Sequence, residues 1–126
     1  MTKVIVDPSC GNSPKAVFVR DFNIAFGTAD TDFLVQHVAN DIIWTIYGDK
    51  VIEGKEAFKK TVEEMKDYVA EEIEIASIVT HGKAAASNGE MLMKDGSRYA
   101  YCDMYEFVSP GKHIIRTLKS YVIKAS

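Results

Sequence analysis

The sequence lacks most of the features that would place it in a specialised class of protein. Only two cysteines occur in 126 residues, too few for a disulfide framework, and no His or Cys residues have the spacing of a metal site. No apolar run approaches the length of a membrane span. Lys and Arg number 15 against 18 Asp and Glu and are scattered, which argues against a nucleic acid or a membrane as partner.

The composition that remains is that of an ordinary globular protein. Apolar residues make up 47% of the chain and charged residues 26%. A chain of this length suits one domain, and we expect residues 1–12 to form an irregular arm and residues 13–126 the domain itself. The first residues lack the pattern of a signal peptide, so a cytoplasmic location with free thiols is expected.

Hydrophobic periodicity and end signals predict the order helix, helix, strand, helix, then four strands. Ser13 is a good N-cap, Pro14 suits the first helical position, and Gly27 is a plausible helix end. The predicted helices cover 13–27, 31–38 and 55–68, and the strands 41–48, 71–81, 83–93, 99–108 and 113–123. Helices gathered on one side of an antiparallel sheet give an α+β fold.

Residues 99–107 alternate between two faces, as in a β-strand. One face carries Tyr99, Tyr101, Asp103, Tyr105 and Phe107. A carboxyl group amid aromatic side chains is an ordinary surface charge if this face is solvated. It is energetically costly, and needs a reason, if the face lines a cavity.

Several strings, in this order and spacing, resemble the SnoaL-like branch of the nuclear transport factor 2-like superfamily. They are TADTDF, DIIWTIYG, EGKEAFKK and DMYEF followed by GKHIIRTLKSY, and together they span most of the chain. That superfamily includes ketosteroid isomerase, polyketide cyclases and limonene epoxide hydrolase. The resemblance implies a cystatin-like α+β barrel, with a curved antiparallel sheet wrapped around three helices of the N-terminal half. It also implies a cone-shaped pocket and, often, a homodimer through the outer sheet face.

The resemblance implies that Asp103 faces the interior of the cone. In ketosteroid isomerase the acid at the matching position is protonated and donates a hydrogen bond to the developing oxyanion. The other catalytic positions of that enzyme fall at or next to Thr45, for the general base, and near Phe22, for the oxyanion tyrosine. Neither side chain can do that work, so steroid isomerase chemistry is disfavoured.

The predicted registers give the other residues of the pocket. A two-residue loop at Asp95 and Gly96 would pair Asn88 with Asp103, and Glu90 with Tyr101. A four-residue loop at 109–112 would add Arg116 and Leu118 to the same face, whereas a three-residue loop would reverse them. The parity of the family assigns Ile43, Thr45 and Tyr47 to the interior, with Trp44 outside unless a bulge turns it inward.

We therefore expect a site for a small hydrophobic molecule, with no metal and no cofactor. Asp103, Glu90 and Tyr101 are the predicted catalytic residues. The predicted ligand-binding residues are Phe22, Thr45, Tyr47, Asn88, Tyr105, Arg116 and Leu118. Each has a structural alternative: a solvated Glu90, an Arg116 paired with an acid, core tyrosines, and a buried Asp103 satisfied by tyrosine hydroxyls.

Two kinds of function fit this site. The first is a cofactor-independent isomerase, cyclase or dehydratase that uses Asp103 in acid–base chemistry. The second is a non-catalytic ligand-binding protein or dimeric accessory protein with the same pocket. If Arg116 points away, loss of hydration should raise the pKa of Asp103. The predicted homodimer interface comprises Ala100, Cys102, Met104, Val108, Ile115 and Tyr121.

Overall fold

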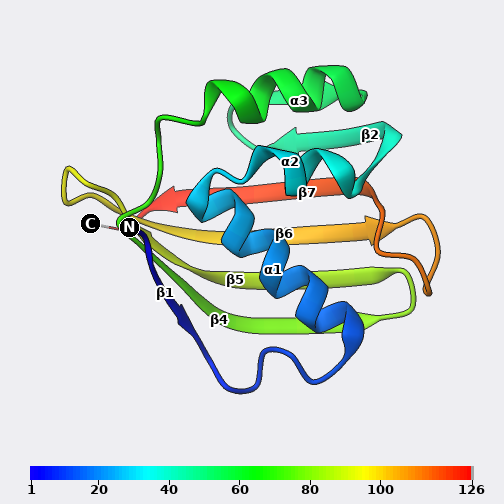
Figure 1. Cartoon of the computed structure of the whole chain (residues 1–126), viewed down its shortest axis with the longest axis horizontal. Helices are drawn as coiled ribbons and strands as arrows, with labels where there is room; N and C mark the ends of the chain where they lie inside the picture. Colours follow the sequence, from blue (N-terminus) through cyan, green and yellow to red (C-terminus); the bar gives the residue numbers. More distant parts are fainter. Residues whose placement is uncertain (126) are drawn as a thin grey trace.

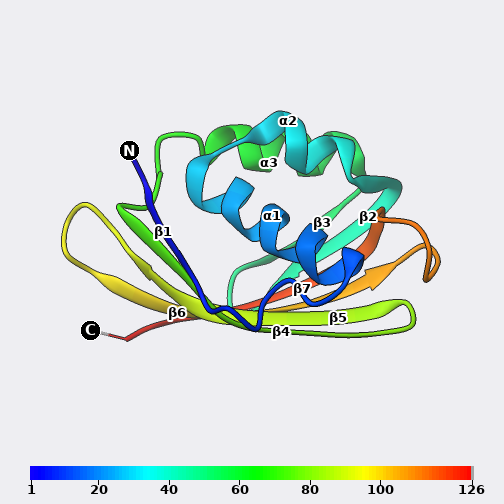
Figure 2. The ribbon, with the colours of Figure 1, turned by 60° about the horizontal axis from the view of Figure 1, so that its bottom comes forward.

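The computed structural model describes residues 1–125, in which three helices cover the concave face of a curved seven-stranded sheet (Figures 1 and 2). The helices are α1 (Pro14–Thr28), α2 (Thr31–Gln36) and α3 (Lys55–Glu64). The strands are β1 (Lys3–Val6), β2 (Val38–Ile46), β3 (Lys50–Glu53), β4 (Glu72–His81), β5 (Ala84–Leu92), β6 (Arg98–Phe107) and β7 (Ile115–Lys124). The predicted α+β class is confirmed.

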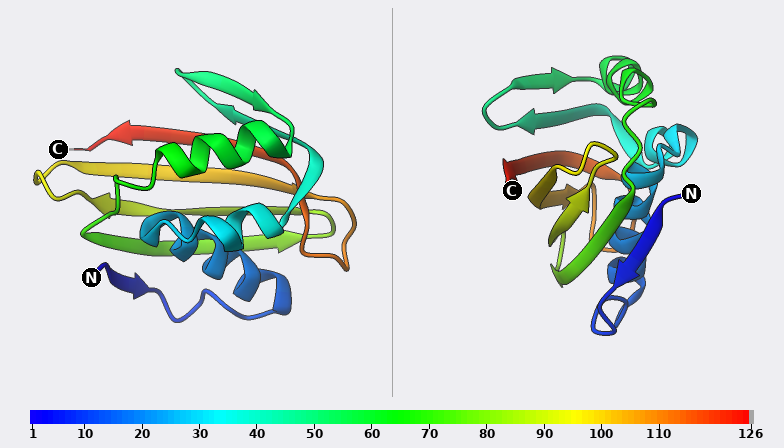
Figure 3. Two further views of the ribbon diagram at one scale, coloured as in Figure 1. Left: turned by 45° about the horizontal axis from the view of Figure 1, so that its top comes forward. Right: turned by 90° about the vertical axis from the view of Figure 1, so that its left-hand side faces the viewer.

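The sheet is open, with the strand order β1-β4-β5-β6-β7-β2-β3 and β1 and β3 at its edges (Figure 3). It is not wholly antiparallel, because β1 runs parallel to β4 and β2 runs parallel to β7. Two strands were not predicted. Strand β1 lies in the segment expected to be an irregular arm, and β3 lies in the turn-rich connection that follows β2.

Helix α1 begins as predicted but ends later. The Ser13 side chain accepts a hydrogen bond from the Ala16 N–H at 3.2 Å, and Pro14 occupies the first turn. The helix continues past Gly27 to a left-handed C-cap at Ala29, whose φ is 59°. Gly27 is needed for close packing instead, because a Cβ there would come within 3.0 Å of the Ile73 side chain on β4.

The hydrophobic core fills one end of the space between helices and sheet. Phe22 on α1, Phe58 on α3 and Phe107 on β6 are completely or almost completely buried in it, together with Ile115 and Leu118 of β7. Burial of each such side chain stabilises the fold by roughly 1.5–3 kcal/mol. The aromatic face of β6 divides between two environments, since Tyr105 and Phe107 lie in the core while Tyr99, Tyr101 and Asp103 line a cavity.

Candidate functional site

The cavity has a volume of about 510 Å³ and lies between the helices and the inner face of the sheet. Its walls come from α1, α3 and the segment that follows α3, and from β2, β3, β5, β6 and β7. Buried lining residues include Asn23, Trp44, Tyr101 and Ser120. We call its exposed lining residues the rim: Asp49, Lys50, Glu64, Met65, Tyr68 and Val122. Most of this volume is bounded by apolar and aromatic side chains, as in a small-molecule site.

Asp103 lies in the middle of β6, and its side chain lines this cavity. Its cross-strand neighbours are Ser87 on β5 and Ser120 on β7. Burial raises the pKa of Asp103 to about 6, because the carboxylate loses hydration, and the nearby hydroxyls of Ser120 and Tyr105 oppose the rise. No ion pair within residues 1–125 involves Asp103. The nearby groups that offset the lost hydration of its carboxyl group are therefore the neutral hydroxyls of Ser120 and Tyr105.

Buried hydrogen bonds fix the groups around Asp103. The Trp44 indole N–H donates to the Ser120 hydroxyl at 3.0 Å, which leaves the Ser120 hydrogen available to the Asp103 carboxylate. On the other side, the Tyr105 hydroxyl lies 3.2 Å from the Ser87 hydroxyl. These contacts join β2, β5, β6 and β7 around one carboxyl group.

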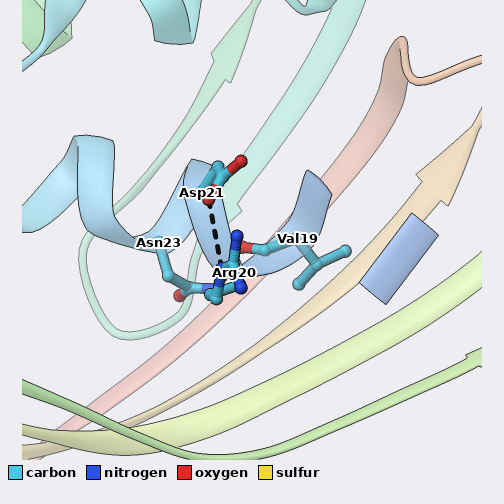
Figure 4. A network of polar contacts seen from close by, with 4 residues as sticks. All are labelled: Val19, Arg20, Asp21 and Asn23. Atoms are coloured by element: carbon cyan, nitrogen blue, oxygen red, sulfur yellow. Dashed lines mark hydrogen bonds and ion pairs between the residues drawn. The ribbon is translucent and has the colours of Figure 1, made fainter. Parts of the chain in front are cut away.

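Asn23 ties α1 to this network. Its Nδ2 donates to the Val19 carbonyl at 2.8 Å, the Ser87 hydroxyl at 3.0 Å and the Tyr105 hydroxyl at 3.1 Å. Figure 4 shows Asn23 beside Val19 on α1, with the adjacent Arg20–Asp21 ion pair. The amide thus connects the helix to two strands of the sheet.

Tyr101 is held by an unusual contact in the sheet. Its hydroxyl donates to the Glu74 carbonyl of β4 at 3.0 Å, across β5. The intervening residue is Gly89, where a Cβ would lie only 1.8 Å from that carbonyl oxygen. Burial raises the pKa of the Tyr101 hydroxyl well above its ordinary value. Tyr101 is therefore a fixed, neutral wall of the cavity.

The predicted β5–β6 register is wrong by one residue. Asp103 pairs with Ser87 and Tyr101 with Gly89, so Asn88 and Glu90 belong to the opposite, outer face of the sheet. The loop contains three residues rather than two, since Met93 pairs with Ser97 and Gly96 takes the left-handed conformation with φ 87°. A type I turn followed by a glycine bulge accounts for this length. Glu90 instead contacts Arg98 at 3.4 Å.

The predicted parity of β2 is also wrong. Trp44 is 4% exposed and Ile42 fully buried, whereas Thr45 is half-buried and Tyr47 is 49% exposed. Tyr47 stacks on Tyr121 of β7, with ring centroids 4.6 Å apart, on the outer face. The alternation of the apolar residues Ile42, Trp44 and Ile46 indicates the face that is buried in the structure. The prediction followed the parity implied by the family resemblance instead, which assigns the other set of residues to the interior.

The remaining predicted residues divide between the core and the surface. Phe22, Tyr105 and Leu118 are all buried in the core, and none of the three lines the cavity. Arg116 is the extra residue of a bulge in β7, because Glu106 and Phe107 pair with Thr117 and Ile115. It is exposed, and its guanidinium lies 3.9 Å from the Asp41 carboxylate, far from the inner face.

Sequence reasoning missed four polar or aromatic groups around Asp103: Asn23, Trp44, Ser87 and Ser120. Asn23 was detectable, because a lone amide among the apolar positions of an amphipathic helix needs a buried partner. Neither serine had a comparable signal, since the positions of both depend on the strand registers.

Within residues 1–125, no group of three or more His, Cys, Asp or Glu side chains is placed to hold a metal ion. None of the helices in the same range is long and apolar enough to cross a membrane.

The family with the description "SnoaL-like domain" matches residues 19–116, which include every residue of the site from Asn23 to Asp103. The chain belongs to the SnoaL-like domain family. No curated protein matches the sequence. The structure is also similar in fold to solved structures of NTF2-like proteins.

Three solved structures illustrate the shared NTF2-like fold. An LEH-like epoxide hydrolase of M. tuberculosis aligns with a TM-score of 0.71 at 18% identity, over 85% of this chain and 80% of that one. The epoxide hydrolase/cyclase-like enzyme SalBIII aligns with a TM-score of 0.69 at 18% identity, over 86% of this chain and 90% of that one. An NTF2-like protein of unknown function from Cytophaga hutchinsonii aligns with a TM-score of 0.67 at 20% identity, over 85% of this chain and 97% of that one. At these identities the likeness concerns the fold.

The chemistry available to this SnoaL-like domain centres on one carboxyl group. A carboxyl with a pKa of about 6 is largely ionised at neutral pH and can still accept or return a proton there. Aromatic side chains, among them Phe26, Trp44 and Tyr101, line the cavity beside it. Neither Glu90 nor Arg116 shares the inner face with Asp103, so neither can act beside it.

Proposed function

We propose that this SnoaL-like protein binds a small, largely hydrophobic molecule in the 510 Å³ cavity and that Asp103 is its acid–base residue. The observation that supports this most is a carboxyl group inside an apolar cavity, with a pKa of about 6 and no cationic partner among residues 1–125. A general base works best when its pKa lies near the working pH.

The proposed reaction class is cofactor-independent proton transfer, as in an isomerisation, cyclisation or dehydration. Asp103 would take a proton from the substrate at one carboxylate oxygen and return it at another position. Ser120, which accepts from Trp44, would donate to the carboxylate and hold it in place. Tyr101 would act as a wall and hydrogen-bond acceptor rather than as an acid, because its proton is engaged by Glu74.

Non-catalytic ligand binding is the second candidate. It is favoured by the composition of the same cavity. Among residues 1–125, Asp103 is the one acid of the cavity with a strongly raised pKa, and no second carboxylate or arginine lies beside it on the inner face. A protein of this kind would bind ligand at Asp103 without turnover.

Solvent exchange at carbon distinguishes the two. The protein is incubated in deuterium oxide with a panel of enolisable cyclic ketones, and deuterium uptake is followed by proton NMR. Catalysis predicts uptake that Asp103→Asn abolishes and Glu90→Gln, on the outer face, leaves unchanged. Ketone binding that perturbs Trp44 without uptake would support the binding function alone. Uptake equal in wild type and Asp103→Asn would contradict the role of Asp103.

We also propose a homodimer through the outer face of the sheet. Tyr121, Ile123 and Met104 are 42%, 70% and 43% exposed and neighbour one another on β6 and β7. Ile115 is not part of this face, contrary to the predicted interface, because the bulge at Arg116 turns it into the core. An apolar surface of this kind is typical of an interaction site.

A further inference from the structure

The buried side-chain donors that line the cavity, those of Asn23, Trp44 and Tyr101, are committed to protein acceptors. The indole N–H of Trp44 donates to Ser120, and the Asn23 amide nitrogen donates to Val19, Ser87 and Tyr105. The Tyr101 hydroxyl donates to the Glu74 carbonyl. Each of these groups has used the hydrogens that it could have offered to a ligand.

The groups left to face a ligand at the buried end are acceptors. The ionised Asp103 carboxylate is an acceptor only, and the Tyr101 oxygen keeps its lone pairs after its hydrogen is engaged. The Asn23 side-chain oxygen accepts none of the hydrogen bonds found within residues 1–125. A ligand that bonds these atoms must therefore bring the hydrogens itself.

Three of the four charged residues that line the cavity are acidic: Asp49, Glu64 and Asp103, against Lys50. Asp103 has no cationic partner among residues 1–125, since the four ion pairs involve Lys3, Arg20, Arg98 and Arg116 with other acids. At the rim, Asp49 and Glu64 outnumber Lys50. A carboxylate removed from water is costly until a cation or donors compensate it.

Aromatic rings surround the same space. Phe26 and Trp44 are 5.5 Å apart between ring centroids and line one wall, while Tyr99 and Tyr101 line the sheet. The faces of such rings attract cations, and tryptophan attracts them most strongly. A carboxylate at the end of an aromatic cavity matches a cation attached to an apolar body.

We infer that the ligand of this cavity is an organic amine, protonated at neutral pH, whose ammonium contacts Asp103 and whose apolar body lies against Phe26, Trp44 and Tyr101. This rests on the proposed function, in that it assumes the cavity is the binding site. It goes beyond that proposal by naming the charge and the donor character of the ligand. An anionic ligand would meet repulsion at both Asp103 and the rim.

Binding of an amine at Asp103 should depend on pH in one direction. The groups that face Asp103 are Asn23 from α1, Trp44 from β2, Ser87 from β5, Tyr101 and Tyr105 from β6, and Ser120 from β7. Among them, the two tyrosines have pKa values raised above the ordinary range and stay neutral. Asp49, Lys50 and Glu64 at the rim are exposed. The affinity for an amine should therefore fall as Asp103 becomes protonated, below pH 6.

Three probes that share one aromatic body test the inference: phenethylamine, phenethyl alcohol and phenylacetate. Trp44, the one tryptophan in the sequence, reports binding by its fluorescence, which these phenyl compounds do not obscure. We expect the amine to bind about tenfold or more tighter than the alcohol at pH 8, and phenylacetate to bind weakest. Asp103→Asn should remove the preference for the amine, while Glu90→Gln should keep it. Lowering the pH to 5 should weaken amine binding to the wild type.

The remaining outcomes separate this inference from the proposed function. Equal binding of amine and alcohol would overturn the inference and leave the cavity as a neutral-ligand site. Tightest binding of phenylacetate, or no amine binding at millimolar concentration, would also overturn the inference. In either case the ketone exchange assay remains an independent test of the proposed function. Should Asp103→Asn fail to fold, the pH dependence in the wild type decides, because a pH-independent amine affinity contradicts contact with Asp103.

Discussion

The Tyr101 hydroxyl reaches the Glu74 carbonyl at 3.0 Å because the residue between them, Gly89, has no side chain. Tyr101 is on β6 and Glu74 on β4, so the hydrogen bond crosses the intervening strand β5. It lies next to a bulge in β4, between Ile75 and Ser77. Gly89 thus allows one hydrogen bond to fix the position of Tyr101 in the cavity wall and to connect β6 with β4 across β5.

Gly89→Ala should destabilise the protein by about 1–3 kcal/mol, the usual range for overpacking a buried position. A Cβ at this position would lie 1.8 Å from the Glu74 oxygen, so the backbone of β4 or β5 has to move and the Tyr101 bond is lost. Urea unfolding measures the change. Gly111→Ala is the matched control, because nothing lies within 4 Å of a Cβ there. Equal stability of both variants would show that the sheet adapts freely.

Asp103→Asn should stabilise the protein at pH 8 by about 1–3 kcal/mol and have little effect near pH 4. The pKa of Asp103 rises from 3.8 to about 6 on folding. Between these values the unfolded chain loses its proton first, so the native state loses stability as the pH rises. Above pH 6 the penalty is complete, and below 3.8 it is absent.

Thermal or urea unfolding across this pH range checks the prediction, with Glu90→Gln as a control at a half-buried acid on the other face. A wild-type stability that rises from pH 4 to pH 8 relative to Asp103→Asn would contradict it. That result would mean that Asp103 has a depressed pKa and a favourable partner in the fold.

Ser120→Ala should raise the pKa of Asp103 above 6, whereas Ser87→Ala should leave it nearly unchanged. Both serines are cross-strand neighbours of Asp103, but only the Ser120 hydroxyl opposes the effect of burial. Titration of the Asp103 carboxyl carbon by NMR gives the two values. Ser120→Ala should also cost about 1–3 kcal/mol of stability, since it leaves the buried Trp44 N–H without its acceptor. An unchanged pKa of Asp103 in Ser120→Ala would show that the Ser120 hydroxyl does not interact with the Asp103 carboxylate.

Tyr121→Lys should convert the proposed dimer into a monomer. Tyr121 lies on the outer face beside Tyr47 and Ile123, so a buried lysine there would lose its hydration on association. Sedimentation at micromolar concentration distinguishes the two masses. Gln36→Lys, an exposed change at the end of α2, is the control and should leave the dimer intact. A wild type that sediments as a monomer would reject the proposal outright.

The general architecture could be predicted because its signals are local. The Ser13 and Pro14 cap, the alternation along β6 and the order of elements all act within a few residues. Periodicity therefore identified the class of fold and grouped Asp103 with the aromatic side chains of its strand, and the resemblance to SnoaL-like proteins implied the curved sheet and the inward orientation of that face.

The neighbours of Asp103 could not be predicted in the same way, because a shift of one residue exchanges the two faces of a strand. Asp95 and Gly96 indicate a turn but not whether it has two or three residues. The bulge at Arg116 likewise has no distinctive sequence, since bulged and regular strands use similar residues. Asn88, Glu90 and Arg116 were misplaced for this reason, and Ser87 and Ser120 were overlooked.

Asn23 bears on how the protein unfolds. Its amide is the polar connection between α1 and strands β5 and β6, and it lies in a buried setting. If the helix detached alone, it would break the hydrogen bonds from this amide to the Ser87 and Tyr105 hydroxyls and expose the apolar core around them to water. Partial opening at this end is therefore disfavoured, and helix and sheet are bound into one cooperative unit. We therefore expect the cavity that α1 covers to keep its shape without a ligand, because α1 should separate from the sheet only when the sheet itself unfolds.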